Sequence, residues 1–256
     1  MRRTRPAAAA SLLAGVKPGW YVLLGLLAYA VVMTVLVLAR PGAAAGAAPA
    51  GAGVNSGTER ASDAAAAYGP AGLWFPVPGA RVPASDDNLP GAPRAYRHGV
   101  SQGFDFFGAD AQVPIQVGTP VVAAQAAQVV RADTAYTEID PRAWEVLMAD
   151  VAAGGADEDQ LDTLRGRQVW LRLDDGTVLR YGHLSAVQGG IRTGARVYRG
   201  QVVGFAGNSG TEAAVAGRGD QPRLRFEVWT APDTFFGAGL EPEAVRMAAA
   251  SLFVGP

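Results

Sequence analysis

The chain has 256 residues, which is enough for one good-sized domain with attachments and gives no reason to expect two large cores. Its formal net charge is -1, and its basic and acidic residues are interspersed over most of the chain, which argues against a nucleic-acid-binding surface. Because cysteine is absent, disulfides, thiolate metal sites and a cysteine nucleophile are excluded. A metal site would need His, Asp or Glu, and the only histidines are His98 and His183.

The first predicted element is a transmembrane helix at residues 20–39, an uncharged apolar run. A helix of about 20 residues crosses a hydrocarbon core of roughly 30 Å. Arginines and a lysine precede the run within residues 1–19, and only Arg40 directly follows it. The positive-inside rule therefore predicts a single-pass anchor in the cytoplasmic membrane, with residues 1–19 in the cytoplasm and the rest of the chain extracytoplasmic. A cleaved signal peptide is the alternative, but the apolar run exceeds the usual 7–15 residues.

Residues 40–72 are rich in Ala, Gly and Pro and predict a flexible linker, because such a composition buries too little apolar surface to offset chain entropy. A globular domain is expected over residues 73–235. Apolar and polar residues alternate there in several segments, and Asp175-Gly176 is typical of a hairpin turn. The pattern predicts a mainly β domain built on an antiparallel sheet.

Two helical regions interrupt or follow the predicted strands. Residues 133–167 carry Pro141 at a predicted helix start and apolar residues at helical spacing around Trp144, which predicts a helical insertion into the sheet. Residues 236–256 predict a C-terminal extension with an amphipathic helix at about 242–252, whose simplest role is packing.

Several segments of the domain carry recognisable motifs in a fixed order. They are Ser101-Gln102-Gly103-Phe104-Asp105, then Gly118-Thr119-Pro120-Val121, Tyr181-Gly182-His183-Leu184-Ser185, Gly200 to Gly210, and Arg223-Leu224-Arg225-Phe226-Glu227-Val228. Together they resemble the lysostaphin/LytM-type zinc peptidoglycan endopeptidases, and their common order makes a chance match improbable. The resemblance implies a compact antiparallel β-sheet of the barrel-sandwich hybrid type that lines a narrow groove.

The same resemblance shows where this chain departs from the family. The positions of the three family zinc ligands are Ser101, Asp105 and Arg225, so only Asp105 keeps a ligating side chain. Of the two further family histidines that act on the zinc-bound water, His183 remains and Arg223 replaces the other. Asp105 is therefore expected to be a vestigial metal ligand, and no cofactor is expected.

His98 is the one candidate for a substitute ligand. It lies seven residues before Asp105, so the two side chains of an extended strand would point to opposite faces unless a bulge at Gly99 intervenes. Arg225 stays protonated and offers no lone pair to a metal. We predict instead that Arg225 or Arg223 pairs with Asp105 through a bidentate bond; the alternative is a solvated strand face.

The remaining predictions concern the groove. Arg223, Arg225, Tyr181 and Ser101 are expected to line it. Two interpretations of His183 are open: a vestigial catalytic role, or a buried histidine that is hydrogen-bonded to the backbone or to Tyr181. Glu227 is expected to be structural.

These residues favour a membrane-anchored pseudopeptidase. It would bind peptidoglycan stem peptides, with Arg223 and Arg225 holding their carboxylates, or regulate a cell-wall hydrolase, as degenerate members of the family do. The alternative is an active zinc metalloendopeptidase that uses Asp105, His98 and His183 as ligands. A third possibility is an adaptor whose binding surface lies on the insertion around Trp144.

Overall fold

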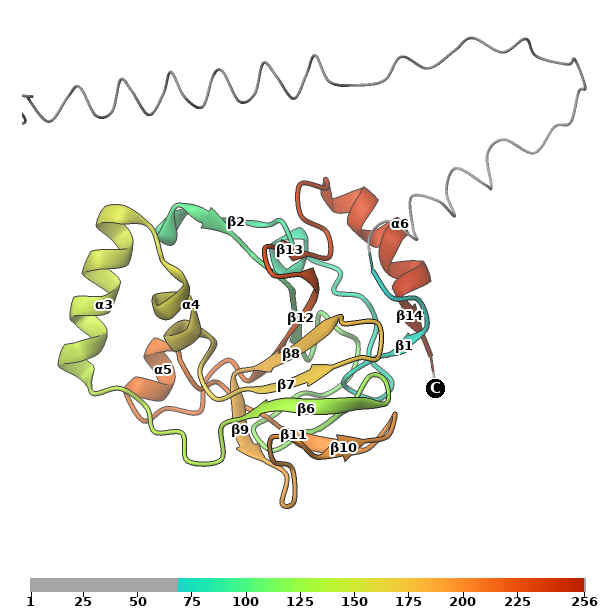
Figure 1. The fold of residues 1–256 in the computed structure, drawn as a ribbon. Helices are drawn as coiled ribbons and strands as arrows, with labels where there is room; N and C mark the ends of the chain where they lie inside the picture. Colours follow the sequence, from blue (N-terminus) through green and yellow to red (C-terminus); the bar gives the residue numbers. More distant parts are fainter. Residues whose placement is uncertain (1–68, 256) are drawn as a thin grey trace, which may run out of the picture. The chain divides into compact units, whose positions relative to one another are not determined.

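A computed structural model describes residues 69–255 (Figure 1). The predicted transmembrane helix at 20–39 and nearly all of the predicted linker lie outside the described residues. Within the described range, none of the helices has both the length and the hydrophobicity needed to cross a bilayer.

The largest sheet is antiparallel throughout and carries the strands of the candidate site. Its strands follow the order β10-β6-β7-β8-β12-β13, and β4 pairs with β12 as well. Their bounds are β4 Phe104–Phe107, β6 Ala127–Ala132, β7 Val169–Arg172, β8 Val178–Gly182, β10 Arg196–Val197, β12 Arg223–Ala231 and β13 Thr234–Phe235. The prediction of a mainly β fold with antiparallel sheets is confirmed.

Three smaller sheets complete the β structure. An antiparallel sheet has the order β5-β11-β9, with β5 at Pro120–Val122, β9 at Leu184–Val187 and β11 at Val202–Ala206. A short hairpin joins β2 (Pro93–Arg94) to β3 (Gly99–Val100), and the 3-10 turns η1 (Asp86–Asn88) and η2 (Ala95–Arg97) lie on either side of β2. The two ends of the domain pair in parallel, which the sequence did not predict, through β1 (Leu73–Trp74) and β14 (Phe253–Val254).

The insertion and the C-terminal extension contain the main helices. Within residues 133–167 lie α3 (Pro141–Gly154) and α4 (Glu158–Arg165), each begun by an aspartate side chain that caps the first backbone N–H groups. They lie together at one end of the sheet, while α6 (Pro242–Leu252) lies beside β1 and β14 (Figure 1). A four-residue helix, α5 (Glu212–Val215), follows β11.

Strand β12 divides its side chains between the core and the groove. Leu224, Phe226 and Val228 are buried in the hydrophobic core, where the ring of Phe226 lies 5.1 Å from that of Tyr181. Because successive strand residues point to opposite faces, Arg223, Arg225 and Glu227 project from the other face. This face, covered at one end by the insertion, positions the candidate site.

Candidate functional site

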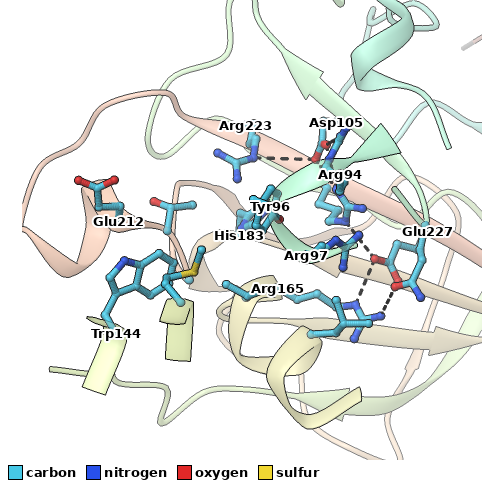
Figure 2. Close-up of a pocket in the computed structure, with 17 residues that line it drawn as sticks. Arg94, Tyr96, Arg97, Asp105, Trp144, Arg165, His183, Glu212, Arg223 and Glu227 are labelled. Atoms are coloured by element: carbon cyan, nitrogen blue, oxygen red, sulfur yellow. Dashed lines mark hydrogen bonds and ion pairs between the residues drawn. The ribbon is translucent and has the colours of Figure 1, made fainter. Parts of the chain in front are cut away.

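The site is built where β12 lies between β4 and β8. In the register of these strands, Arg225 is opposite Asp105 of β4 on one side and Gly182 of β8 on the other. The residue after Gly182 is His183, so the pairing gathers the motif residues of three distant segments at one place. Figure 2 shows Asp105, Arg223 and His183 around the same cavity.

All three nitrogens of the Arg225 guanidinium donate hydrogen bonds inside the protein. Its Nη1 donates to both carboxylate oxygens of Asp105, at 2.9 and 2.8 Å. Its Nη2 donates to the Ser101 hydroxyl at 3.0 Å, and its Nε donates to Glu227 Oε1 at 3.0 Å. The predicted pairing with Asp105 is confirmed, although a single nitrogen makes it, because the other two nitrogens serve other partners. Each of the three Arg225 nitrogens therefore already has a partner, and one Nη2 N–H is left, so its role as a carboxylate clamp stays a prediction.

Two further arginines surround the Asp105 carboxylate. Arg94 Nη2 donates to Oδ2 at 3.1 Å, and Arg223 Nε lies 3.9 Å from Oδ1. Burial alone would raise the pKa of Asp105, but Arg225, followed by Arg223, outweighs it and holds the pKa at about 2. The carboxylate is therefore ionised at any physiological pH.

Glu227 has the structural role that was predicted for it, and it joins the insertion to the sheet, a link that the sequence did not indicate. Its Oε1 accepts hydrogen bonds from Arg225 and from Arg165, the last residue of α4, at 3.0 and 3.1 Å. Its Oε2 accepts one from the Trp229 indole at 2.8 Å. Burial would raise the pKa of Glu227, but Arg165 and Arg225 lower it to about 2. The strand alternation that places Glu227 beside Arg225 was the only sequence signal for this role.

His183 is buried and neutral. Its Nδ1 lies 2.7 Å from the Ser209 carbonyl oxygen, and since a carbonyl only accepts, Nδ1 is the protonated nitrogen and Nε2 carries the lone pair. Burial, reinforced by Arg223, lowers the pKa of His183 to about 3. The interpretation as a buried histidine bonded to the backbone is confirmed. Its ring also lines the cavity.

The cavity has a volume of about 260 Å³ and two chemically different walls. One wall carries five arginines and two carboxylates: Arg94, Arg97, Arg165, Arg223, Arg225, Asp105 and Glu227. The other wall is mostly apolar and comes from the insertion: Trp144 and Met148 of α3, with Leu161 and Leu164 of α4. Trp144 and Glu212 lie across the cavity from Asp105 and Glu227 (Figure 2). The cavity thus combines excess positive charge with an apolar face.

Comparison with known proteins identifies the domain. Residues 106–235 match the profile of "Peptidase family M23", which covers half of the chain. The chain belongs to peptidase family M23. The match begins directly after Asp105, so the segment that holds Ser101 and Asp105 lies outside it.

Solved structures of M23 peptidases resemble the chain at low identity. The catalytic domain of lysostaphin from Staphylococcus simulans is 20% identical, with 61% of this chain and 82% of that chain covered and a TM-score of 0.35. The catalytic domain of an A109H mutant of the prophage-encoded M23 protein EnpA from Enterococcus faecalis is 20% identical over 69% of this chain and 96% of that chain, with a TM-score of 0.40. A zinc-containing peptidase from Vibrio cholerae is 19% identical over 63% and 37%, also with a TM-score of 0.40. No curated protein matches the chain.

The residues at the M23 metal position do not fit zinc. Both oxygens of Asp105 are held by Arg225, whose guanidinium occupies the space beside them. His183 is the one histidine at the cavity, and across residues 69–255 no three His, Asp or Glu side chains are grouped as a metal site. A catalytic zinc site normally has three protein ligands.

His98 does not supply the missing ligand. It follows η2 in a left-handed conformation, with a φ of 51°, and its Nε2 lies 2.8 Å from the Ala152 carbonyl oxygen of α3. This turn directs the exposed imidazole toward the insertion, away from the cavity that Asp105 lines. The substitute-ligand interpretation is therefore wrong for this structure.

Two of the predicted groove residues lie elsewhere. Tyr181 is fully buried on the core face, where its hydroxyl accepts a hydrogen bond from the Ala124 N–H at 2.9 Å. Strand alternation explains this position, because Tyr181 is opposite Phe226 in the register of β8 and β12. Ser101 is also fully buried; its hydroxyl accepts a hydrogen bond from Arg225, and the residue does not line the cavity.

Proposed function

We propose that this M23 chain is a pseudopeptidase that binds peptidoglycan peptides without cutting them or regulates a cell-wall hydrolase. The observation that carries the proposal is the guanidinium of Arg225 on the Asp105 carboxylate. A metallopeptidase of this type needs a metal ion that polarises the scissile carbonyl and activates water. Here the position of one family ligand holds a fixed cation that has no lone pair.

Electrostatics oppose a metal at this place. At an effective dielectric constant of 20, two unit charges 4 Å apart interact by about 4 kcal/mol, so a dication beside Arg225 would be repelled by about 8 kcal/mol. The pKa of Arg225 is raised, despite its burial, by Asp105 and Glu227, so loss of its proton offers no escape. The cavity is therefore better suited to binding than to hydrolysis.

The cavity offers complementary groups for a peptide. Within residues 69–255 the side chain of Arg223 makes no hydrogen bond, and its guanidinium is available to a carboxylate. The Nε2 lone pair of His183 suits a backbone N–H, and the apolar wall around Trp144 suits an aliphatic side chain. Peptidoglycan stem peptides carry all three kinds of group.

We also propose that the protein is located in the cell envelope. The apolar run at 20–39 and the basic residues before it support a single-pass anchor with the M23 domain outside the cytoplasmic membrane. An anchored domain of this kind would meet peptidoglycan and hydrolases at the membrane surface.

Zinc content separates this proposal from the active-peptidase alternative. The full-length protein, purified with zinc supplied and then desalted, should contain far less than one zinc per chain. A content of about one zinc per chain would instead favour the active metalloendopeptidase and call for a hydrolysis assay.

Binding is tested with purified sacculi. Arg223→Gln should lower the affinity of the full-length protein for sacculi, measured by co-sedimentation, by about 10-fold or more, because one charge-assisted hydrogen bond is lost. Arg196→Gln is the matched control, because Arg196 lies on β10 in an exposed ion pair with Asp174 at 3.1 Å. If the wild type does not bind sacculi, or if Arg223→Gln binds like Arg196→Gln, peptide capture by this cavity is wrong.

A further inference from the structure

Arg97 is a buried arginine that has no acidic partner in the described part of the chain. Its side chain comes from η2, outside the segment that matches the M23 profile, and only 8% of the residue is exposed. One nitrogen, Nη2, donates to the Val100 carbonyl oxygen. Nε is buried without any partner, and within residues 69–255 Nη1 makes no hydrogen bond.

The two carboxylates on the same cavity wall as Arg97 are already bound by other arginines. Asp105 is bound by Arg225 and Arg94, and Glu227 is bound by Arg225 and Arg165. Burial lowers the pKa of Arg97; Tyr96 opposes this, and the guanidinium groups around Arg97, that of Arg225 first, lower the pKa further. A buried cation without a counter-ion is costly, and the cost is removed if an anion binds beside it.

Arg97 also stands where two cavities adjoin. It lines the cavity described above and a second one of about 650 Å³, and Gln102 and Leu161 line both as well. The second cavity runs between the β3 segment and the turn that joins α3 to α4, and Gly99, Gly154 and Gly155 line it.

We propose that Arg97 receives the C-terminal carboxylate of the bound peptide, whose last side chain packs against Leu161. The preceding residues would run along the first cavity, past His183 and Arg223. The inference rests on the proposed peptide binding and makes it more specific: the ligand is a free chain end with an apolar last residue.

The chemistry of the walls favours a chain end over a phosphate. The Nε2 lone pair of His183 attracts a peptide N–H and repels a phosphate oxygen. The insertion contributes an apolar surface for which a phosphate has no matching group. A carboxylate beside an aliphatic side chain uses both walls.

Paired peptides test the inference with the full-length protein and without any mutation. The probes are N-acetyl-Ala-Ala-Leu as the free acid and as the amide, with binding followed by calorimetry. The free acid should bind about 10- to 100-fold more tightly than the amide, since one charge-assisted interaction is lost. Equal affinities, or no binding of either probe, would overturn the chain-end assignment.

Variants and a competitor locate the effect. Arg97→Gln should abolish the preference for the acid, whereas Arg196→Gln should keep it. A preference that survives Arg97→Gln would refute the role of Arg97, and inorganic phosphate that displaces the acid at equal concentration would assign a general oxyanion site instead. The outcome is separable from the proposed function, because sacculi binding that depends on Arg223 can persist when acid and amide bind equally.

Discussion

Replacing Arg225 by methionine should destabilise the domain by about 3–5 kcal/mol at pH 7, the usual cost when one partner of a buried ion pair is removed. Arg225 makes contacts of 2.8–3.0 Å with Asp105, Ser101 and Glu227. The ion pair with Asp105 accounts for a large part of this destabilisation, because folding lowers the pKa of Asp105 from 3.8 to about 2 and each pKa unit corresponds to about 1.4 kcal/mol. Methionine fills much of the volume but donates no hydrogen bond.

The pH dependence of the loss identifies its source. Because the folded-state pKa values of Asp105 and Glu227 lie below their unfolded values, their contribution is complete above about pH 4.5 and is lost as the pH falls toward 2. The difference between the wild type and Arg225→Met should therefore be full at pH 7 and smaller at pH 3. Urea unfolding of the full-length protein, followed by tryptophan fluorescence, measures the free energy of unfolding at both values.

Arg223→Met is the matched control. Arg223 lies two residues away on the same face of β12, but its Nε is 3.9 Å from Asp105 and its side chain makes no hydrogen bond within residues 69–255. Its loss should therefore cost clearly less than the loss of Arg225, because no hydrogen bond is broken. If both variants lose the same free energy, or if Arg225→Met loses less than about 1 kcal/mol, Arg225 does not hold the site together as argued.

Two other predictions concern the surroundings of the cavity. In the unfolded chain His183 takes up a proton below about pH 6.5, whereas in the folded chain its pKa is about 3 and it stays neutral. The free energy of unfolding should therefore be about 2 kcal/mol lower at pH 5 than at pH 7. His183→Asn, which tolerates the φ of 58°, should remove this fall, while His98→Asn should keep it, and urea unfolding at the two pH values decides. The guanidinium of Arg180 lies 4.0 Å from the Trp170 ring and 4.2 Å from the Trp229 ring, so Arg180→Lys should cost about 1–2 kcal/mol in thermal unfolding, and an unchanged melting temperature would exclude a stacking contribution.

The part of the site that follows from strand pairing was predictable from the sequence. The alternation in β12 places Arg223, Arg225 and Glu227 on one face. The family motifs, present in the family's order, indicate that this strand lies close to Asp105. The same alternation argues against Tyr181 as a groove residue, since it shares a face with the buried Leu179. The prediction for Tyr181 was wrong because it followed the motif and ignored the period of the strand.

The contribution of the insertion was not predictable in the same way. Arg165 and Glu227 are 62 residues apart, and no local pattern indicates that the end of α4 lies over β12. His98 illustrates a second difficulty. The positive φ that turns its side chain toward α3 belongs to a short 3-10 turn, and few non-glycine residues adopt this conformation.

Ser101 and Arg225, which the motif resemblance aligns with zinc-ligand positions, depend on each other. Arg225 uses one nitrogen for Asp105, one for Glu227 and one for Ser101. A larger imidazole at the fully buried position 101 would compete with the guanidinium for this space, and a histidine at position 225 alone would leave the Ser101 hydroxyl without its donor. Each reversion by itself therefore removes a contact without creating a metal site. Residues that share partners in this way show interaction energies of about 0.5–3 kcal/mol, so Ser101→His and Arg225→His should be non-additive in the free energy of unfolding.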